Sequence, residues 1–277
     1  MLTEYYYNFF DMTVVVKMND FILAKLINAI LGDIRCKYKA HTLITTIIQE
    51  FNENIYIFKV DDEIILKSND VHRAALELSS EIINRFVHGS NGLLFLHAGA
   101  VQKGNQVLVL IGKSKSGKTS LVSTLINQYG YKFLSDEIVP IEIKSGKVFP
   151  FYRALSIRKE TFRFLRMKRH QYVDISTVDD EIVRFMSYKN LSDVIEYNRE
   201  NGISAVVFPH FGRDTFLNKI DSKLAFIKIL ECSVNFRSIV NEGTDFIINL
   251  LLNTKLYELS IDDINDAAIC ISKMFEL

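Results

Sequence analysis

The sequence is organised around the segment Val107-Leu108-Val109-Leu110-Ile111-Gly112-Lys113-Ser114-Lys115-Ser116-Gly117-Lys118-Thr119. Its five apolar residues are typical of a buried strand, and the residues from Thr119 to Gln128 have helical periodicity. Between them, Gly112 to Thr119 satisfy the pattern G-x-x-x-x-G-K-[ST]. Glycines let the backbone curl so that several N–H groups converge on one phosphate, and the N-terminus of the following helix adds positive potential. The segment therefore predicts a phosphate-binding loop in the strand–loop–helix context that the pattern requires.

The loop supplies a set of expected nucleotide-binding residues. We expect Lys118 to reach the β- and γ-phosphates and the Thr119 hydroxyl to hold Mg²⁺. The alternative is an ordinary glycine turn with solvated lysines. The full expected set is Gly112, Lys113, Ser114, Lys115, Ser116, Gly117, Lys118, Thr119 and Ser120.

Composition excludes several classes of protein. The 277 residues carry 33 basic and 33 acidic side chains, and 48% are apolar. An apolar share of this size excludes a wholly disordered chain, and zero net charge argues against a nucleic-acid binder, which needs a basic surplus. The N-terminus lacks signal-peptide features, and the longest apolar runs are strand-sized, so we expect a cytoplasmic protein that does not cross a membrane.

The chain divides best at Ser90-Asn91-Gly92. We expect a small α/β accessory domain over residues 1–90 and a phosphate-loop domain over residues 91–277. In the second part, Leu93 to Val101 read as one apolar strand. Residues 138–143 and 148–151 read as the two arms of a hairpin.

A second nucleotide motif is weaker. Asn218-Lys219-Ile220-Asp221 matches the N-K-x-D guanine signature, but no D-x-x-G lies between it and the phosphate loop. Without that γ-phosphate sensor, a GTPase is disfavoured, and a surface turn is the better interpretation.

Two adjacent acids follow a short predicted strand. Asp136 and Glu137 stand at the end of the strand Tyr131–Leu134, where the bound phosphates would lie. A phosphoryl-transfer enzyme needs a metal ligand and, for an alcohol acceptor, a carboxylate to take the proton. The pair fits both needs, and the alternative is a solvated turn.

At this point a family resemblance is visible. It rests on Leu96-His97-Ala98-Gly99-Ala100-Val101, on Val109 to Thr119, and on Phe133-Leu134-Ser135-Asp136-Glu137-Ile138-Val139. In this order the segments resemble the HPr kinase/phosphorylase-like P-loop kinases. More narrowly, they are similar to the HPr-kinase-like proteins of lasso-peptide and other ribosomal-peptide pathways. The resemblance covers about residues 90 to 277.

The resemblance implies an α/β kinase core with a mixed sheet. It implies an enzyme that uses ATP and Mg²⁺ to phosphorylate a serine hydroxyl on a peptide or small protein, with HPr itself as an alternative acceptor. In this family pattern Asp136 falls on the general base, Glu137 lies near the metal, and His97 lies near the reacting phosphate. A satisfied strand histidine is the alternative for His97. Members of the family often form oligomers, so a homo-oligomer is also expected.

The sequence departs from the family pattern in two places. Lys115 stands where the family loop usually has glycine. In place of a Glu-Ile-Arg-Gly-type signature there is only Ser156-Ile157-Arg158-Lys159, which favours a kinase without the phosphorylase reaction. The departures also motivate a second hypothesis, a nucleotide-binding regulatory module that transfers no phosphate.

Three basic residues are candidates for binding the substrate. Arg153, Arg158 and Lys159 follow a predicted strand and are candidates to clamp phosphates or an acceptor carboxylate. A basic cluster at residues 163–170 is followed in the sequence by acidic residues at 174–181. This segment is either a lid or peptide-binding loop, or a solvated surface helix.

Overall fold

The computed structural model describes residues 2–10, 12–37, 42–158, 161, 172–177, 181–190 and 202–274. Contacts among them divide the chain into two compact units. The first holds Met1–Asn91 with the later stretches Tyr152–Phe162 and Met167–Ser187, and the second begins at Gly92. In the described ranges, no helix is long and apolar enough to cross a membrane.

The first unit is built on a six-stranded mixed sheet with the strand order β3-β1-β2-β4-β5-β6. Only the pair β2 and β4 is parallel. Its elements are β1 (Thr3–Phe9), β2 (Met12–Met18), α1 (Phe21–Leu31), a 3-10 turn (Gly32–Ile34), β3 (Arg35–Cys36), β4 (Thr42–Asn52), β5 (Ile55–Val60), β6 (Glu63–Ser68) and α2 (Val71–Gly89).

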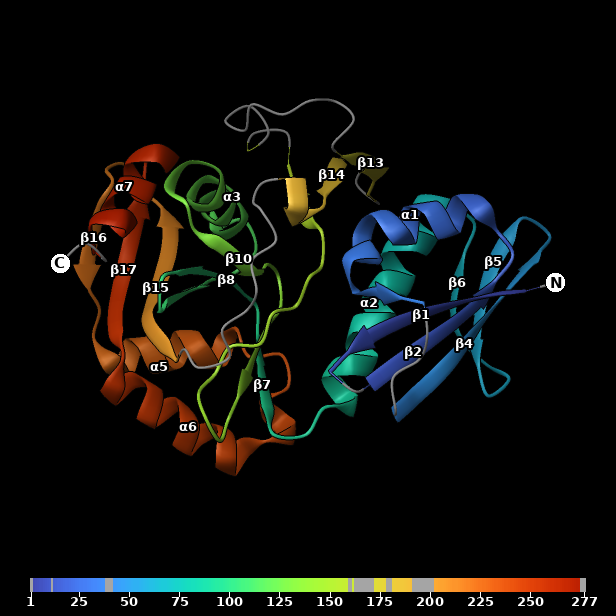
Figure 1. The fold of residues 1–277 in the computed structure, drawn as a ribbon, viewed down its shortest axis with the longest axis horizontal. Coiled ribbons are helices and arrows are strands. Elements are labelled where there is room, and N and C mark those ends of the chain that lie inside the picture. Colours follow the sequence, from blue (N-terminus) through green and yellow to red (C-terminus); the bar gives the residue numbers. More distant parts are fainter. Residues whose placement is uncertain are drawn as a thin grey trace. The chain divides into compact units, whose positions relative to one another are not determined.

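The helices α1 and α2 each begin at a capping aspartate. Asp20 accepts a hydrogen bond from the Leu23 N–H, and Asp70 accepts one from the Arg73 N–H. Such caps satisfy donors that the first helical turn leaves open. Figure 1 shows α1 and α2 beside the sheet, and the buried residues of each helix recur at helical spacing.

Three further strands, from later in the sequence, complete the first unit. They are β12 (Leu155–Ile157), β13 (Val173–Ser176) and β14 (Ile182–Met186), in the order β12-β14-β13. The Ala154 N–H donates to the Ile30 carbonyl at 2.9 Å, and Ser187 Oγ donates to Asp33 Oδ2 at 2.6 Å. Because these three strands belong to the first unit, the two units differ from the predicted division into 1–90 and 91–277.

The second unit carries the phosphate-loop segment on another six-stranded sheet, with the order β10-β8-β9-β15-β17-β16. The three strands β9, β15 and β17 are parallel, and the outer strands are antiparallel. The expected α/β architecture with a mixed sheet is thus confirmed. The elements are β7 (Leu93–Leu96), β8 (Ala98–Lys103), β9 (Gln106–Ile111), α3 (Lys118–Tyr129), β10 (Lys132–Ser135), β11 (Val139–Glu142), two 3-10 turns (Tyr188–Asn190 and Phe236–Ser238), β15 (Ile203–Phe211), β16 (Phe216–Lys219), α5 (Ser222–Glu231), α6 (Val240–Asn253), β17 (Lys255–Ile261) and α7 (Ile264–Met274).

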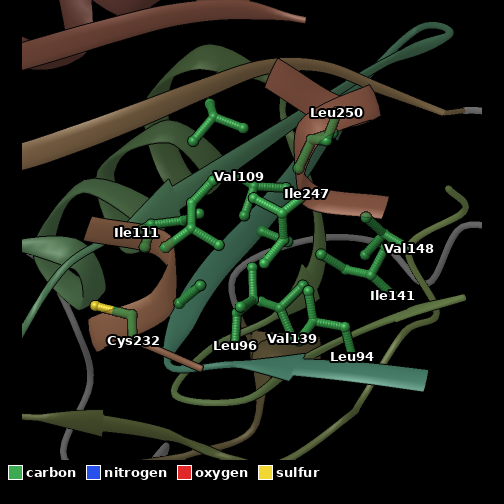
Figure 2. Packing of buried hydrophobic residues seen from close by; sticks show 14 of the residues in the cluster. Leu94, Leu96, Val109, Ile111, Val139, Ile141, Val148, Cys232, Ile247 and Leu250 are labelled. Carbon is green, nitrogen blue, oxygen red and sulfur yellow. The ribbon is translucent and has the colours of Figure 1, made fainter. Parts of the chain in front are cut away.

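Alternation along β8 assigns the helices to the two faces of this sheet. Ala98 and Ala100 point into a core that α5 and α6 close with Ile229, Ile247 and other apolar residues (Figure 2). Gly99, between them, faces α3, because a Cβ there would lie 2.7 Å from Val122 Cγ2. Burying one Leu or Ile side chain contributes about 1.5–3 kcal/mol, so the two-sided core fixes the sheet position from which the loop emerges.

The single strand expected over Leu93–Val101 is wrong, because the chain breaks at His97. Leu93–Leu96 form β7, which pairs with β11, whereas Ala98–Lys103 form β8, which pairs with β9 and β10. The other edge of β7 is occupied by residues 233–235, through a bridge between Leu96 and Ser233 and a hydrogen bond from the Val234 N–H to the Phe95 carbonyl. His97 therefore lies at the junction of two sheets.

The hairpin expected over 138–151 is formed only in part. Its first arm is β11, but Val148 makes only an isolated bridge to Ile141. The chain then leaves the pair at Pro150, which has no N–H to donate, and the Phe151 N–H donates to the Leu134 carbonyl at 3.0 Å.

We expect Asn235 to be a major determinant of stability in the second unit. Its amide is buried, accepts from the Phe95 N–H at 2.9 Å, and donates to the Leu93 carbonyl at 2.8 Å. Asn235→Ala leaves both backbone groups without this partner and should lower the free energy of unfolding by about 2–3 kcal/mol. The measurement is urea denaturation. Asn253→Ala, at an exposed site, is the control and should change stability by less than about 0.5 kcal/mol. Equal losses in the two variants would contradict this role.

Candidate nucleotide site

The phosphate-loop segment has the predicted strand–loop–helix form. β9 ends at Ile111, α3 begins at Lys118, and Gly117 caps the helix with φ at 95°. A Cβ on Gly117 would lie 3.1 Å from Ile261 Cδ1, and one on Gly112 would lie 2.6 Å from Ser116 Oγ and 3.4 Å from the Pro209 carbonyl oxygen. Both motif glycines are therefore required by the geometry. A close-fitting loop with a helix N-terminus is the cradle that a phosphate needs.

Lys115 occupies a backbone conformation that favours glycine. Its φ is 66°, in the left-handed region, which costs an ordinary residue about 1–2 kcal/mol. This is the position at which the family loop usually has glycine. The structure thus gives a physical reason for the family's preference.

Lys118 is folded back onto its own loop. Its side chain is only 5% exposed, and Nζ donates to the Gly112 carbonyl at 2.6 Å and to the Lys113 carbonyl at 2.9 Å. Burial lowers the pKa of Lys118, and the negative charges of Glu137 and Asp136 oppose that shift. The ammonium is therefore held inside the loop beside two acids, as the expected contact with phosphates requires.

Thr119 and Asp136 are brought together although 17 residues separate them. Thr119 Oγ1 donates to Asp136 Oδ2 at 2.9 Å, and Asp136 is 2% exposed. Gly99 on the intervening strand lets α3 approach, because a Cβ there would lie 2.7 Å from Val122 Cγ2. A loop hydroxyl next to a strand-end aspartate is the pair that holds Mg²⁺ in P-loop proteins.

Glu137 points to a different partner. Its φ of 71° turns the chain after Asp136, and its Oε2 lies 3.0 Å from His97 Nε2. The two side chains are 33% and 29% exposed, so both are accessible to a second substrate. The His97 N–H donates to the Cys232 carbonyl at 2.7 Å, which anchors the histidine at the break between β7 and β8.

The remaining loop residues lie at the rim. Lys113 is exposed and pairs with Glu231 at 2.9 Å, and the hydrogen bond that its ammonium donates to that carboxylate raises the pKa of Lys113. Ser114 is also exposed, whereas Ser116 and Ser120 are half-buried. The loop therefore presents exposed residues outside and Lys118 inside.

Two of the predicted substrate residues belong to the other compact unit. Arg153 and Arg158 belong to the first unit, where the Arg153 guanidinium carbon is 5.9 Å from the centre of the Phe185 ring. Lys159 and the basic cluster at 163–170 lie outside the described residues. Their role in substrate binding stays a prediction.

The N-K-x-D segment is used structurally, at the end of β16 and the start of α5. Asp221 caps α5 by accepting from the Lys223 and Leu224 N–H groups. Lys219 pairs with Tyr257, near the start of β17, whereas the loop lies at the end of the parallel strands. The segment is at the surface, as expected, but it forms a strand end and a helix cap rather than a turn.

Two residues that support the site were not expected from the sequence to have a role in it. Gly99 makes room for Val122 of α3, and its place between two alanines in an apolar strand was a usable signal for close packing. Asn235 braces the strand that precedes His97 from 140 positions away, and nothing local to either residue indicates this contact.

Comparisons with known proteins give similarities among solved structures. The chain matches no protein-family model and no curated protein. Among solved structures 30 chains match, and one is described as the structure of the HPr(Ser) kinase/phosphatase from Coxiella burnetii. That match covers 66% of this chain and 93% of the other, with 9% sequence identity and a TM-score of 0.31. The functional interpretation therefore rests on the geometry of the site.

No group of three or more His, Cys, Asp or Glu side chains able to hold a metal ion occurs in the part of the chain that the structure describes. Magnesium is commonly bound by one or two protein oxygens together with substrate phosphates and water. The Thr119 hydroxyl and the Asp136 carboxylate fit that pattern.

Replacing Lys115 by glycine should relieve the strain in the loop. Lys115→Gly removes the cost of a left-handed side-chain residue but adds flexibility to the unfolded chain, so we expect a net gain of about 0.5–1 kcal/mol in stability. Thermal unfolding of the protein without added nucleotide measures this gain in stability. Lys144→Gly, at an exposed turn lysine outside the left-handed region, should destabilise instead. A loss of stability in both variants would show that Lys115 is not strained.

Proposed function

We propose that the chain is a kinase that transfers the γ-phosphoryl group of a nucleoside triphosphate to a serine hydroxyl of a peptide or small protein. The single observation that carries this proposal is the hydrogen bond between Thr119 and Asp136, beside the buried Lys118. It unites a phosphate cradle and a metal-binding pair, while the accessible Glu137 and His97 stand nearby.

The residues of the loop bind and orient the donor. Backbone N–H groups at the start of α3 and the Lys118 ammonium neutralise the phosphate oxygens. Thr119 and Asp136 would hold Mg²⁺, which neutralises charge on the β- and γ-phosphates when bound. Both protein groups already lie within hydrogen-bond distance, so little reorganisation is needed.

The acids are assigned by their exposure. The sequence resemblance implies Asp136 as the base and Glu137 near the metal, whereas the contacts favour the reverse. A base must reach the serine hydroxyl, and Glu137 is 33% exposed while Asp136 is 2% exposed. In the transfer, the serine oxygen bonds to the γ-phosphorus, the bond to the β-phosphate oxygen breaks, and the serine proton passes to the Glu137 carboxylate. His97 orients that carboxylate through its Nε2.

Three substitutions separate these roles in an assay with γ-labelled ATP. The acceptors are a precursor peptide encoded beside the gene and purified HPr. Glu137→Gln should lower transfer at least 100-fold and preserve nucleotide binding, because the amide cannot accept the proton. Asp136→Asn should raise the Mg²⁺ concentration needed for half-maximal rate. Lys118→Met should abolish nucleotide binding.

Glu142→Gln is the matched control, since Glu142 pairs with Ser145 in a surface turn. It should leave transfer unchanged. Full transfer by Glu137→Gln with none by Asp136→Asn would restore the roles implied by the family resemblance. Binding of ATP without transfer to either acceptor would favour a nucleotide-binding regulatory module.

A further inference from the structure

An exposed aromatic side chain lies directly beside the phosphate loop. Phe211 is the last residue of β15 and is 58% exposed. Its Cζ and Cε2 lie 3.5 and 3.7 Å from the position of a Cβ on Gly117. The buried Ile261 lies 3.1 Å from the same position and pairs in register with Phe211. An apolar surface is therefore left open to water at the entrance of α3.

The order of strands gives the donor a direction. Asp136 follows β10, on the β8 side of β9, whereas Phe211 ends β15 on the opposite side of β9. A triphosphate whose terminal phosphate faces Thr119 and Asp136 extends its nucleoside toward the ends of β15 and β17. In an open α/β sheet this carboxyl edge is where ligands bind.

We propose that Phe211, backed by Ile261, is the platform on which the base of the donor nucleotide stacks, and that it makes the site selective for purines without distinguishing adenine from guanine. The inference rests on the proposed function, because it needs a triphosphate in the loop. Stacking on an aromatic ring accepts any base, and the larger purines gain more from it.

The guanine-like motif does not compete with this assignment. Asp221 of the N-K-x-D segment caps α5 through two backbone N–H groups. That carboxylate is engaged in the fold and lies near the start of β17, away from Phe211. Base recognition through Phe211 therefore has no guanine-specific partner at Asp221.

Phe216 provides a matched control on the same sheet. It is 43% exposed and lies on β16, opposite Ser260. Ser260 and Ile261 are successive residues of β17, so their side chains point to opposite faces. Phe216 is thus a comparable exposed phenylalanine on the face opposite to Ile261.

The test is calorimetric titration of the full chain with ATP, GTP, CTP and inorganic tripolyphosphate in Mg²⁺. Phe211→Ala should weaken ATP and GTP binding about tenfold and leave tripolyphosphate binding unchanged. Phe211→Trp should retain purine binding. Phe216→Ala should match the unsubstituted protein, which should bind ATP and GTP within a few-fold of each other and CTP more weakly.

The outcomes separate the two proposals. Unchanged ATP binding in Phe211→Ala, or equal losses in Phe211→Ala and Phe216→Ala, overturns the stacking platform alone. A preference of more than about tenfold between ATP and GTP overturns the purine-tolerant site. Failure of both ATP and tripolyphosphate to bind the unsubstituted protein overturns the proposed function itself, and the platform with it.

Discussion

The hydrogen bond from Thr119 to Asp136 connects two segments that are not neighbours in the sheet. Thr119 opens the helix after β9, Asp136 follows β10, and β8 lies between those strands. The contact needs α3 to approach β8 closely, and Gly99 permits this because a Cβ there would lie 2.7 Å from Val122 Cγ2. The position of the loop helix over the intervening strand therefore depends on the absence of a side chain at Gly99. The loop motif alone would give a cradle without a metal-binding partner.

Local sequence patterns predicted the elements whose periodicity arises within a single segment. The apolar run before Gly112 and the helix that follows the loop have the expected positions. The break at His97 could not be predicted this way. Residues 93–101 are apolar except for His97, but the first four pair with β11 and are braced by Asn235, 140 positions away from Phe95. Which edge a strand joins depends on such distant partners, and the local alternation carries no trace of them.

Within the site, two adjacent residues show the same limit of prediction from local sequence. The sequence placed Asp136 and Glu137 at a strand end near the loop, and both are there. It did not show which acid meets which partner, because successive strand residues point in opposite directions only while the strand is regular. The left-handed φ of Glu137 ends that regularity and sends one carboxylate to Thr119 and the other to His97. A backbone turn of this kind in a non-glycine residue has no reliable sequence signal.

On the proposed function, the affinity of the site for phosphate depends on the interactions that Lys118 makes before a phosphate replaces them. Lys118 already donates two hydrogen bonds to loop carbonyls, and its burial lowers its pKa, so the ammonium is held in place at a cost in solvation. A phosphate oxygen offers this buried charge a negative partner, which the two carbonyls cannot match. On the proposed function, the desolvation of Lys118 is a cost that a triphosphate would relieve, which favours a ligand with several negative charges over a neutral one that fits the same space.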